Sequence, residues 1–418
     1  MMAAGISTVE YLHPSSDSEK QTYTSITTLG GPFGALTTHN ESGITLTLHQ
    51  LLVDQVSLKG RPILSLTEEI SSRARTIDEA LAILRANRTS STWRLILTSL
   101  EENRSVNVDL SPLGVFVTPL EKLGNAVTNT AINPAMQKDE FALDFSFYAD
   151  TRYRHMVLGT RLKNFSAATV QDAIDLISSH ESFDVYQKSW KDKSPRNTIG
   201  KRSNVQSLVL APSDGLVYVA VPPMPFARPL EGSYIPLPIS SKEWRANPDY
   251  LSLPSLKRRK AFNRDFVEAN AYFRKAVIPL TEEGRFEEGI RLIEEAAKLQ
   301  PDEAAYPLTA AWTEFLVYWR SEDPKVRDEA LERAYEFLNR AEDLELENYH
   351  ENLIWLFKAR YFDLKNDREA AKKYLFRVKR DISKQLAEAA DRQEKFGYSR
   401  SQLRSMVIDY LNVDLHQF

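Results

Sequence analysis

Residues 30–50 read GGPFGALTTHNESGITLTLHQ, and this stretch decides the fold of the first half of the chain. Apolar residues at 44, 46 and 48 alternate with polar residues at 45, 47 and 49, a period of two that predicts a half-buried β-strand. Residues 39–43, HNESG, predict a tight turn before that strand, because Asn and Gly readily adopt positive φ. The stretch therefore predicts a β-hairpin in a core sheet.

Periodicity on either side of the hairpin predicts separate blocks of strands and helices up to about residue 240. Strands are predicted at 7–12, 22–29, 93–100, 105–110, 205–211 and 216–221, short strands or strand ends at 115–118 and 125–130, and helices at 63–75, 77–87, 149–163 and 169–178. Residues 187–202 are predicted to form a polar loop, and 222–238 an irregular segment because it contains six prolines. Strands and helices segregated in this way predict a layered α+β fold.

The pattern changes near residue 263, where long amphipathic helices replace strands. Residues 284–290 (GRFEEGI) and 296–302 (AAKLQPD) resemble a tetratricopeptide (TPR) unit, and 341–344 and 366–371 resemble degenerate copies. Aromatic residues fall at helical spacing, so Trp312 and Trp355 are predicted to be buried in the core rather than to line a ligand cage. The expected organisation is a first domain at 1–240, a linker at 241–262 and an all-α TPR-like domain at 263–418.

Composition excludes several classes of function. The formal net charge is −4, which argues against a nucleic-acid-binding protein, and residues 256–260 (LKRRK) are interpreted as a solvated linker. No apolar run approaches the length of a membrane helix, and the first 14 residues lack a secretory signal pattern, so a cytoplasmic protein is expected. The chain has no Cys, and its seven His show no ligand spacing, so neither a metal site nor a cofactor is predicted.

The opening hairpin also carries a family resemblance. It is similar to a G-x-x-G-x-x-T-G-x-N-E-x-G segment of the penicillin acyltransferase-like branch of the N-terminal-nucleophile (Ntn) hydrolases, relatives of the choloylglycine hydrolases. The matching positions are Gly31, Gly34, Thr37, Asn40, Glu41 and Gly43. The resemblance covers about residues 8–238, and it departs from the pattern where Thr38 replaces Gly and His39 replaces Met. It implies a four-layer αββα sandwich that acts on linear amide bonds of a small acyl-amide or peptide-like substrate, without a cofactor.

Five residues take site roles through this resemblance. Asn129, His49 and Arg152 match positions that support catalysis by holding the oxyanion or orienting the nucleophile region, and Thr37 and Asn40 match substrate-binding positions. Each of the first three also has an ordinary structural interpretation. Asn129 is then a strand-end cap, His49 an exposed strand residue, and Arg152 a helix ion-pair partner.

The nucleophile implied by the resemblance is a Cys upstream of the matched segment, and the chain has none. Three interpretations stay open: a truncated amide hydrolase, a pseudoenzyme scaffold, and an interaction protein that binds a partner through its helical repeats. On any of them, the 418 residues alone are predicted to be inactive. Because the family's first strands are absent from the chain, the resemblance also predicts an incomplete first sheet, with residues 7–12 or a neighbouring strand as an exposed edge.

Overall fold

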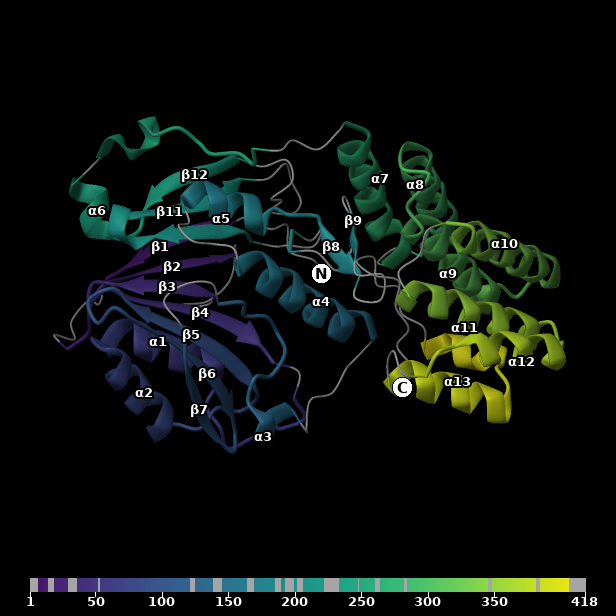
Figure 1. Cartoon of the computed structure of the whole chain (residues 1–418), viewed down its shortest axis with the longest axis horizontal. Helices are drawn as coiled ribbons and strands as arrows, with labels where there is room; N and C mark the ends of the chain where they lie inside the picture. The colour runs from purple at the N-terminus through teal and green to yellow at the C-terminus, as the bar shows by residue number, and fades with distance from the viewer. Residues whose placement is uncertain are drawn as a thin grey trace. The chain divides into compact units, whose positions relative to one another are not determined.

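The computed structural model describes most of the chain, in two compact units (Figure 1). The described residues are 7–13, 19–28, 36–51, 53–120, 125–137, 145–163, 169–184, 189–191, 199–200, 206–221, 233–246, 248–259, 264–281, 284–344, 348–380 and 384–405. Unit 1 comprises Met1–Phe141, Thr151–His180 and Asn197–Ala261, and unit 2 comprises Ala142–Asp150, Glu181–Arg196 and Phe262–Phe418. The chain is thus a mixed protein of helices and antiparallel strands.

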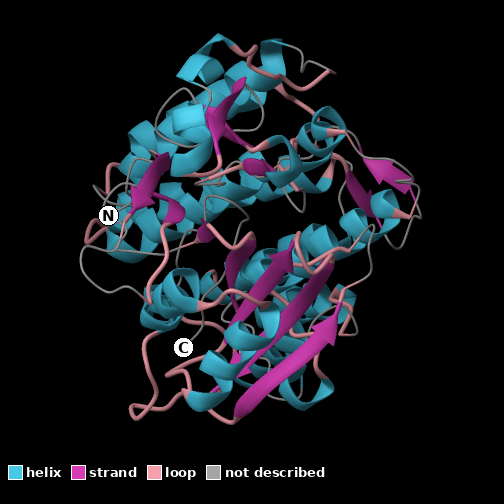
Figure 2. Ribbon diagram, turned by 90° about the vertical axis from the view of Figure 1, so that its left-hand side faces the viewer, coloured by secondary structure: helices cyan, strands magenta, loops and turns pink. Residues whose placement is uncertain are grey.

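Unit 1 is built on a seven-stranded antiparallel sheet whose strands follow one another in chain order, as labelled in Figure 1. Figure 2 draws the strands in magenta and the helices in cyan. Its strands are β1 (Ser7–Leu12), β2 (Tyr23–Thr28), β3 (Thr37–Asn40), β4 (Ile44–Gln50), β5 (Trp93–Ser99), β6 (Arg104–Ser111) and β7 (Gly114–Pro119). The predicted hairpin is β3–β4, and Gly43 has a φ of 77° in its turn. The glycines before β3 lie outside the described residues. Strand β1 stands at one end of the strand order, where an edge strand was predicted.

Two helices cover one face of this sheet. Helix α1 (Ile63–Arg73) and helix α2 (Ile77–Ala86) bury apolar residues against Ile44, Leu46 and Leu48 of β4. The Thr76 side chain accepts a hydrogen bond from the backbone N–H of Glu79 and so caps the start of α2. Because side chains alternate across a strand, residues 45, 47 and 49 lie on the opposite face, called here the second face.

A smaller antiparallel sheet joins β10 (Leu208–Ala211), β11 (Leu216–Val221) and β12 (Ser233–Pro238). The predicted hairpin is confirmed, and its turn is the short helix η1 (Pro212–Asp214) followed by Gly215 at a φ of 68°. The prediction that 222–238 contains no regular structure is wrong, because Ser233–Pro238 pairs with β11. Strand β12 is the last in the strand order, and an edge strand tolerates proline because half of its N–H groups need no ladder partner.

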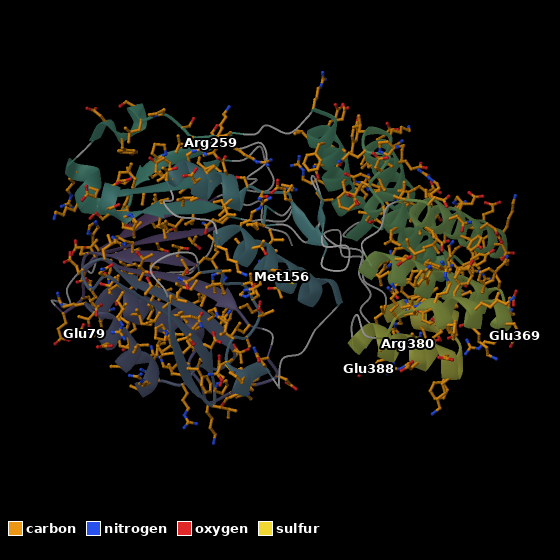
Figure 3. All side chains as sticks on the ribbon, in the orientation of Figure 1. Glu79, Met156, Arg259, Glu369, Arg380 and Glu388 are labelled. Carbon is orange, nitrogen blue, oxygen red and sulfur yellow. The ribbon has the colours of Figure 1, made fainter. Side chains whose placement is uncertain are left out.

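Apolar contacts join the second face of the long sheet to this smaller sheet. Ile26 of β2 packs with Val217 and Val219 of β11, and the Tyr11 hydroxyl of β1 donates a 2.8 Å hydrogen bond to the Pro238 carbonyl. Helix α5 (Val170–Ile177) packs with the smaller sheet through Ile174, which clusters with residues of β11 and β12. Arg259, labelled in Figure 3, forms ion pairs with Asp172 and Asp175 of α5.

The other described elements of this half of the chain are short, apart from one helix. They are α3 (Pro134–Gln137), α4 (Phe145–Leu162), β8 (Ser182–Asp184), β9 (Ser189–Lys191), α6 (Ser241–Ala246) and η2 (Pro248–Ser252). Two predictions are wrong here. Residues 125–130 form no strand, because side chains of the long sheet hold their backbone, and the predicted polar loop at 187–202 contains β9.

From residue 264 onward the described residues form only helices. They are α7 (Arg264–Thr281), α8 (Phe286–Leu299), α9 (Ala305–Arg320), α10 (Pro324–Glu342), α11 (Asn348–Leu364), α12 (Arg368–Arg377), α13 (Lys384–Phe396) and η3 (Arg400–Ser405). Each α-helix contacts the next in sequence, and one core cluster runs through them. Trp312 and Trp355 are buried, as predicted. No helix among the described residues is both long and apolar enough to cross a membrane.

The closest approach between α7 and α8 depends on Gly289. A Cβ added at this glycine would lie 2.2 Å from Cδ2 of the buried Leu280. We expect Gly289→Ala to destabilise unit 2 by about 1–2 kcal/mol, because the displaced Leu280 must repack in a dense core.

Gly159 of α4 is the matched control, because nothing lies within 4 Å of its added Cβ. Gly159→Ala should instead stabilise by about 0.5–1 kcal/mol through helix propensity. Denaturant unfolding measures both, and a stabilising Gly289→Ala would contradict this packing.

Candidate functional site

The second face of the long sheet carries a row of polar side chains across β4, β5 and β6. His49 pairs in register with Arg94, and Arg94 pairs with Asp109. Arg94 and Asp109 are almost completely buried, and their side chains form a bidentate ion pair with N–O distances of 2.6 and 2.9 Å. Bidentate Arg–carboxylate pairs of this kind are strong and geometrically specific. On the second face of β5 and β6, a buried ion pair therefore stands where a sheet core usually has apolar side chains.

This ion pair holds the segment 128–133 against the sheet. Nη1 of Arg94 donates to the carbonyls of Thr128 and Thr130 at 2.8 and 2.7 Å. The Asp109 carboxylate accepts from the backbone N–H groups of Ile132 and Asn133 at 3.3 and 3.4 Å. The residue between the two carbonyls is Asn129, so its backbone position is fixed from both sides.

Three elements converge on Asn129. Its Nδ2 donates to the Gln50 carbonyl at the end of β4 at 3.0 Å, and its backbone N–H donates to Oγ1 of Thr151 in α4 at 2.9 Å. Nη2 of Arg154, also in α4, donates to Asn129 Oδ1 at 3.2 Å. The Asn129 amide keeps a second N–H to which the described residues offer no acceptor.

His49 is one of the titratable groups of this site. Its ring is half-buried, and the described residues make no hydrogen bond to it. Burial lowers the pKa of His49 to about 4, and the positive charges of Arg94 and Arg154 act in the same direction. At neutral pH the ring is therefore an uncharged imidazole, with one N–H to donate and one nitrogen to accept.

The structure brings together some of the predicted site residues and not others. Arg154 hydrogen-bonds to Asn129, and its charge also acts on His49. Thr37 lies on the same second face as His49, in register with Thr47. Arg152 lies in α4 between Thr151 and Arg154, but its side chain lies outside the described residues. Its predicted role stays a prediction.

Asn40 lies on the opposite face, towards α1. Its Nδ2 donates to the carbonyls of Ser71 and Ala74 at 3.2 and 2.8 Å, and its Oδ1 accepts from the backbone N–H of Ile44. The Asn40 amide therefore ties the β3–β4 turn to the end of α1. The structure does not bring it to His49 and Asn129, and its predicted substrate contact has no geometric support.

Sequence reasoning missed Arg94, Asp109 and Arg154. The signal was present in β5 and β6, where a charged residue stands at a matching position in each arm of a hairpin closed at 100–103. Charged residues in alternating strands usually face solvent, so the pairing became informative only once burial was known. Among the described residues, no three His, Asp or Glu side chains gather as metal ligands do.

Comparison with known proteins leaves the family open, since no protein-family model and no curated protein matches the chain.

Two histidines of the long sheet make the stability of unit 1 depend on pH. Burial lowers the pKa of His39 to about 4, as it does that of His49, and Nδ1 of His39 hydrogen-bonds to Oγ1 of Thr45 at 2.9 Å. The unfolded chain takes up these protons below its ordinary His pKa of about 6.5, whereas the folded chain does so only near pH 4. The contribution of these two histidines to the stability of unit 1 is therefore fully present above about pH 6.5, and it is lost as the pH falls towards 4.

We expect His39 to contribute about 2–3 kcal/mol to this loss at pH 4.5. Urea unfolding of the wild type and of His39→Gln, at pH 7 and pH 4.5, measures the difference. His13 is exposed, so His13→Gln serves as the control. This variant should lose as much stability between pH 7 and pH 4.5 as the wild type does. Equal losses in the wild type and in His39→Gln would show that His39 is not held neutral by the fold.

Proposed function

We propose that unit 1 is an acyl-amide-binding domain of the Ntn type, related to the penicillin acyltransferase-like hydrolases. In this proposal, His49 and Asn129 hold the carbonyl oxygen of a small acyl-amide or peptide-like substrate. The observation that carries it is the convergence of β4, the segment 128–133 and α4 on Asn129, whose Nδ2 bonds to the residue that follows the uncharged His49.

The packing of unit 1 supports this proposal. Helices α1 and α2 lie on one face of the long sheet, the smaller sheet packs on the other, and α5 packs on the smaller sheet. That order corresponds to the four αββα layers that the family resemblance implies. The polar row lies on the second face, which in such a sandwich is the face between the sheets.

The chemistry of the two side chains suits a carbonyl oxygen. The second N–H of the Asn129 amide and the ring N–H of an uncharged His49 are both neutral donors. Donors held in place before the substrate binds stabilise the negative charge that develops on the oxygen during acyl transfer. Arg154 orients the Asn129 amide by bonding its oxygen, which directs the nitrogen away from the guanidinium.

The proposal assigns binding and polarisation to this chain, because the 418 residues contain no Cys to act as the family's nucleophile. A nucleophile outside these residues would complete a hydrolase, and without one the domain is a scaffold that binds amides. The helical array of unit 2 favours a second candidate, an interaction protein, because α7–α13 stack in sequence as TPR-like repeats do.

The test is titration calorimetry of the full chain with N-acyl amides of increasing acyl length. Asn129→Ala should weaken binding about tenfold through the lost hydrogen bond. Asn87→Ala is the matched control, because the Asn87 side chain donates to the Ile83 carbonyl of α2 in the same unit. Equal affinity of the wild type and of Asn129→Ala, or no binding by the wild type, would overturn the proposed function.

A further inference from the structure

Arg360 of α11, in unit 2, is a buried cation without an acceptor. Only 1% of its surface is exposed, and its three guanidinium nitrogens have no hydrogen-bond partner among the described residues. Its contacts are two aromatic rings, with Cζ 4.4 Å from the ring centroid of Tyr398 and 5.6 Å from that of Phe357. Cation–π contacts offset only part of the cost of removing a guanidinium from water.

Two other unpartnered polar groups, on side chains that contact Phe357 or Arg360, can donate hydrogen bonds. Trp312, whose ring centroid lies 5.4 Å from that of Phe357, has an unpartnered Nε1, and the Tyr398 hydroxyl is unpartnered as well. Both side chains are buried, and burial raises the pKa of Tyr398, so its hydroxyl keeps its proton. The chemistry that complements such a set is an acceptor with negative charge.

Unit 2 offers no internal carboxylate for this role among its described residues. Asp363, one turn further along α11, accepts hydrogen bonds from Arg368 and Gln393. Glu342 is paired with Lys358 and Arg377. The nearby acidic groups are therefore already neutralised by other partners.

We propose that Arg360, Tyr398 and Trp312 form a binding site for a small oxyanion, a carboxylate or an inorganic phosphate, with Arg360 as its charged anchor. Tyr398 contacts Arg360 and also lines a pocket of about 310 Å³, together with Ser399, Gln402 and the ion pair of Asp363 and Arg368. It follows Gly397, which has a φ of 74° that favours glycine. The Arg360 nitrogens are enclosed in this structure, so the anion enters from the pocket as the Tyr398 ring turns aside.

Energetics give this site two measurable signatures. Without the anion, an unpaired buried charge destabilises unit 2, so an apolar residue of similar length should be better tolerated. With the anion, binding to the folded state alone raises stability in proportion to occupancy. The Arg360→Met variant should therefore unfold at a temperature about 4–8 °C above that of the wild type in chloride buffer. In phosphate or acetate, the difference between the two melting temperatures should become smaller.

The experiment follows thermal unfolding of the full chain by tryptophan fluorescence, in chloride, phosphate and acetate at matched ionic strength. Phosphate stabilises many proteins because it is excluded from their surface. The quantity compared is therefore the rise in melting temperature caused by the anion in the wild type minus the rise in the variant. The wild type should gain about 3 °C more than Arg360→Met in the preferred anion. The acetate and phosphate arms separate a carboxylate ligand from an inorganic one.

Arg377→Met is the matched control, because Arg377 also lies over an aromatic ring, 4.5 Å from the centroid of Trp355, but has a carboxylate partner. The Arg377→Met variant should show the same rise in melting temperature with the anion as the wild type. An equal response in the wild type and in Arg360→Met overturns the site, and so does the absence of any response in the wild type. If Arg360→Met fails to fold, Tyr398→Phe removes only the hydroxyl, and an unchanged response in that variant overturns the site.

Discussion

Removing one partner of the Arg94–Asp109 pair is expected to cost about 3–5 kcal/mol of stability in unit 1. Arg94→Met leaves the Asp109 carboxylate buried, with only Asn107 and two long backbone contacts to satisfy it. It also frees the carbonyls of Thr128 and Thr130, so the segment that carries Asn129 loses its attachment to β5. Urea unfolding measures the loss of stability. Calorimetric titration with the acyl amides should show that the variant no longer binds them.

The double variant Arg94→Met/Asp109→Leu separates stability from positioning. With both charges gone, stability should return to within about 1–2 kcal/mol of the wild type, because an apolar pair replaces a desolvated ion pair. Amide binding should stay weak, since the segment 128–133 loses its hydrogen bonds to β5 and β6. The exposed Arg104–Asp78 pair is the control, where Arg104→Met should cost less than about 1 kcal/mol. A cost equally small for Arg94→Met would contradict a buried pair that organises the site.

The second large effect concerns catalysis. The 418-residue chain alone should release no amine from acyl amides by the Ntn route, because it contains no Cys. Extending it with the nucleophile-bearing segment that precedes the matched stretch in that family should raise the rate by several orders of magnitude. Loss of a nucleophile commonly leaves only the small residual rate due to binding and oxyanion contacts.

The assay is amine release from a panel of acyl amides by both versions of the protein. Turnover by the unextended chain that Asn129→Ala abolishes would reveal a different nucleophile at the same site. Inactivity of both versions, with amide binding retained, would favour the scaffold interpretation.

The hairpins and helices that local pattern determines could be predicted from the sequence. Strand β4 follows from strict alternation over 44–49, and the β10–β11 turn follows from its Pro–Ser–Asp–Gly sequence. Strand β12 could not be predicted, because two prolines within it are tolerated only at a sheet edge, and the strand order is not visible in sequence.

The site was predictable only in part, for a similar reason. Asn129 and His49 are predicted through a motif, but the prediction of a short strand or strand end at 125–130 is wrong. The carbonyls of Thr128 and Thr130 instead accept hydrogen bonds from Arg94, which lies 34 and 36 residues away in sequence. Which side chains are buried depends on what covers the second face, and that is a tertiary property.

The most direct test of the proposed amide site is the infrared carbonyl band of a ¹³C-labelled acyl amide bound to the full chain. Polarisation by the neutral donors of His49 and Asn129 weakens the C=O bond, so the band should move to lower wavenumber on binding. The shift should shrink in Asn129→Ala and stay unchanged in the Asn87→Ala control. A band that stays at its solution position in the bound wild type would contradict the assignment of this site.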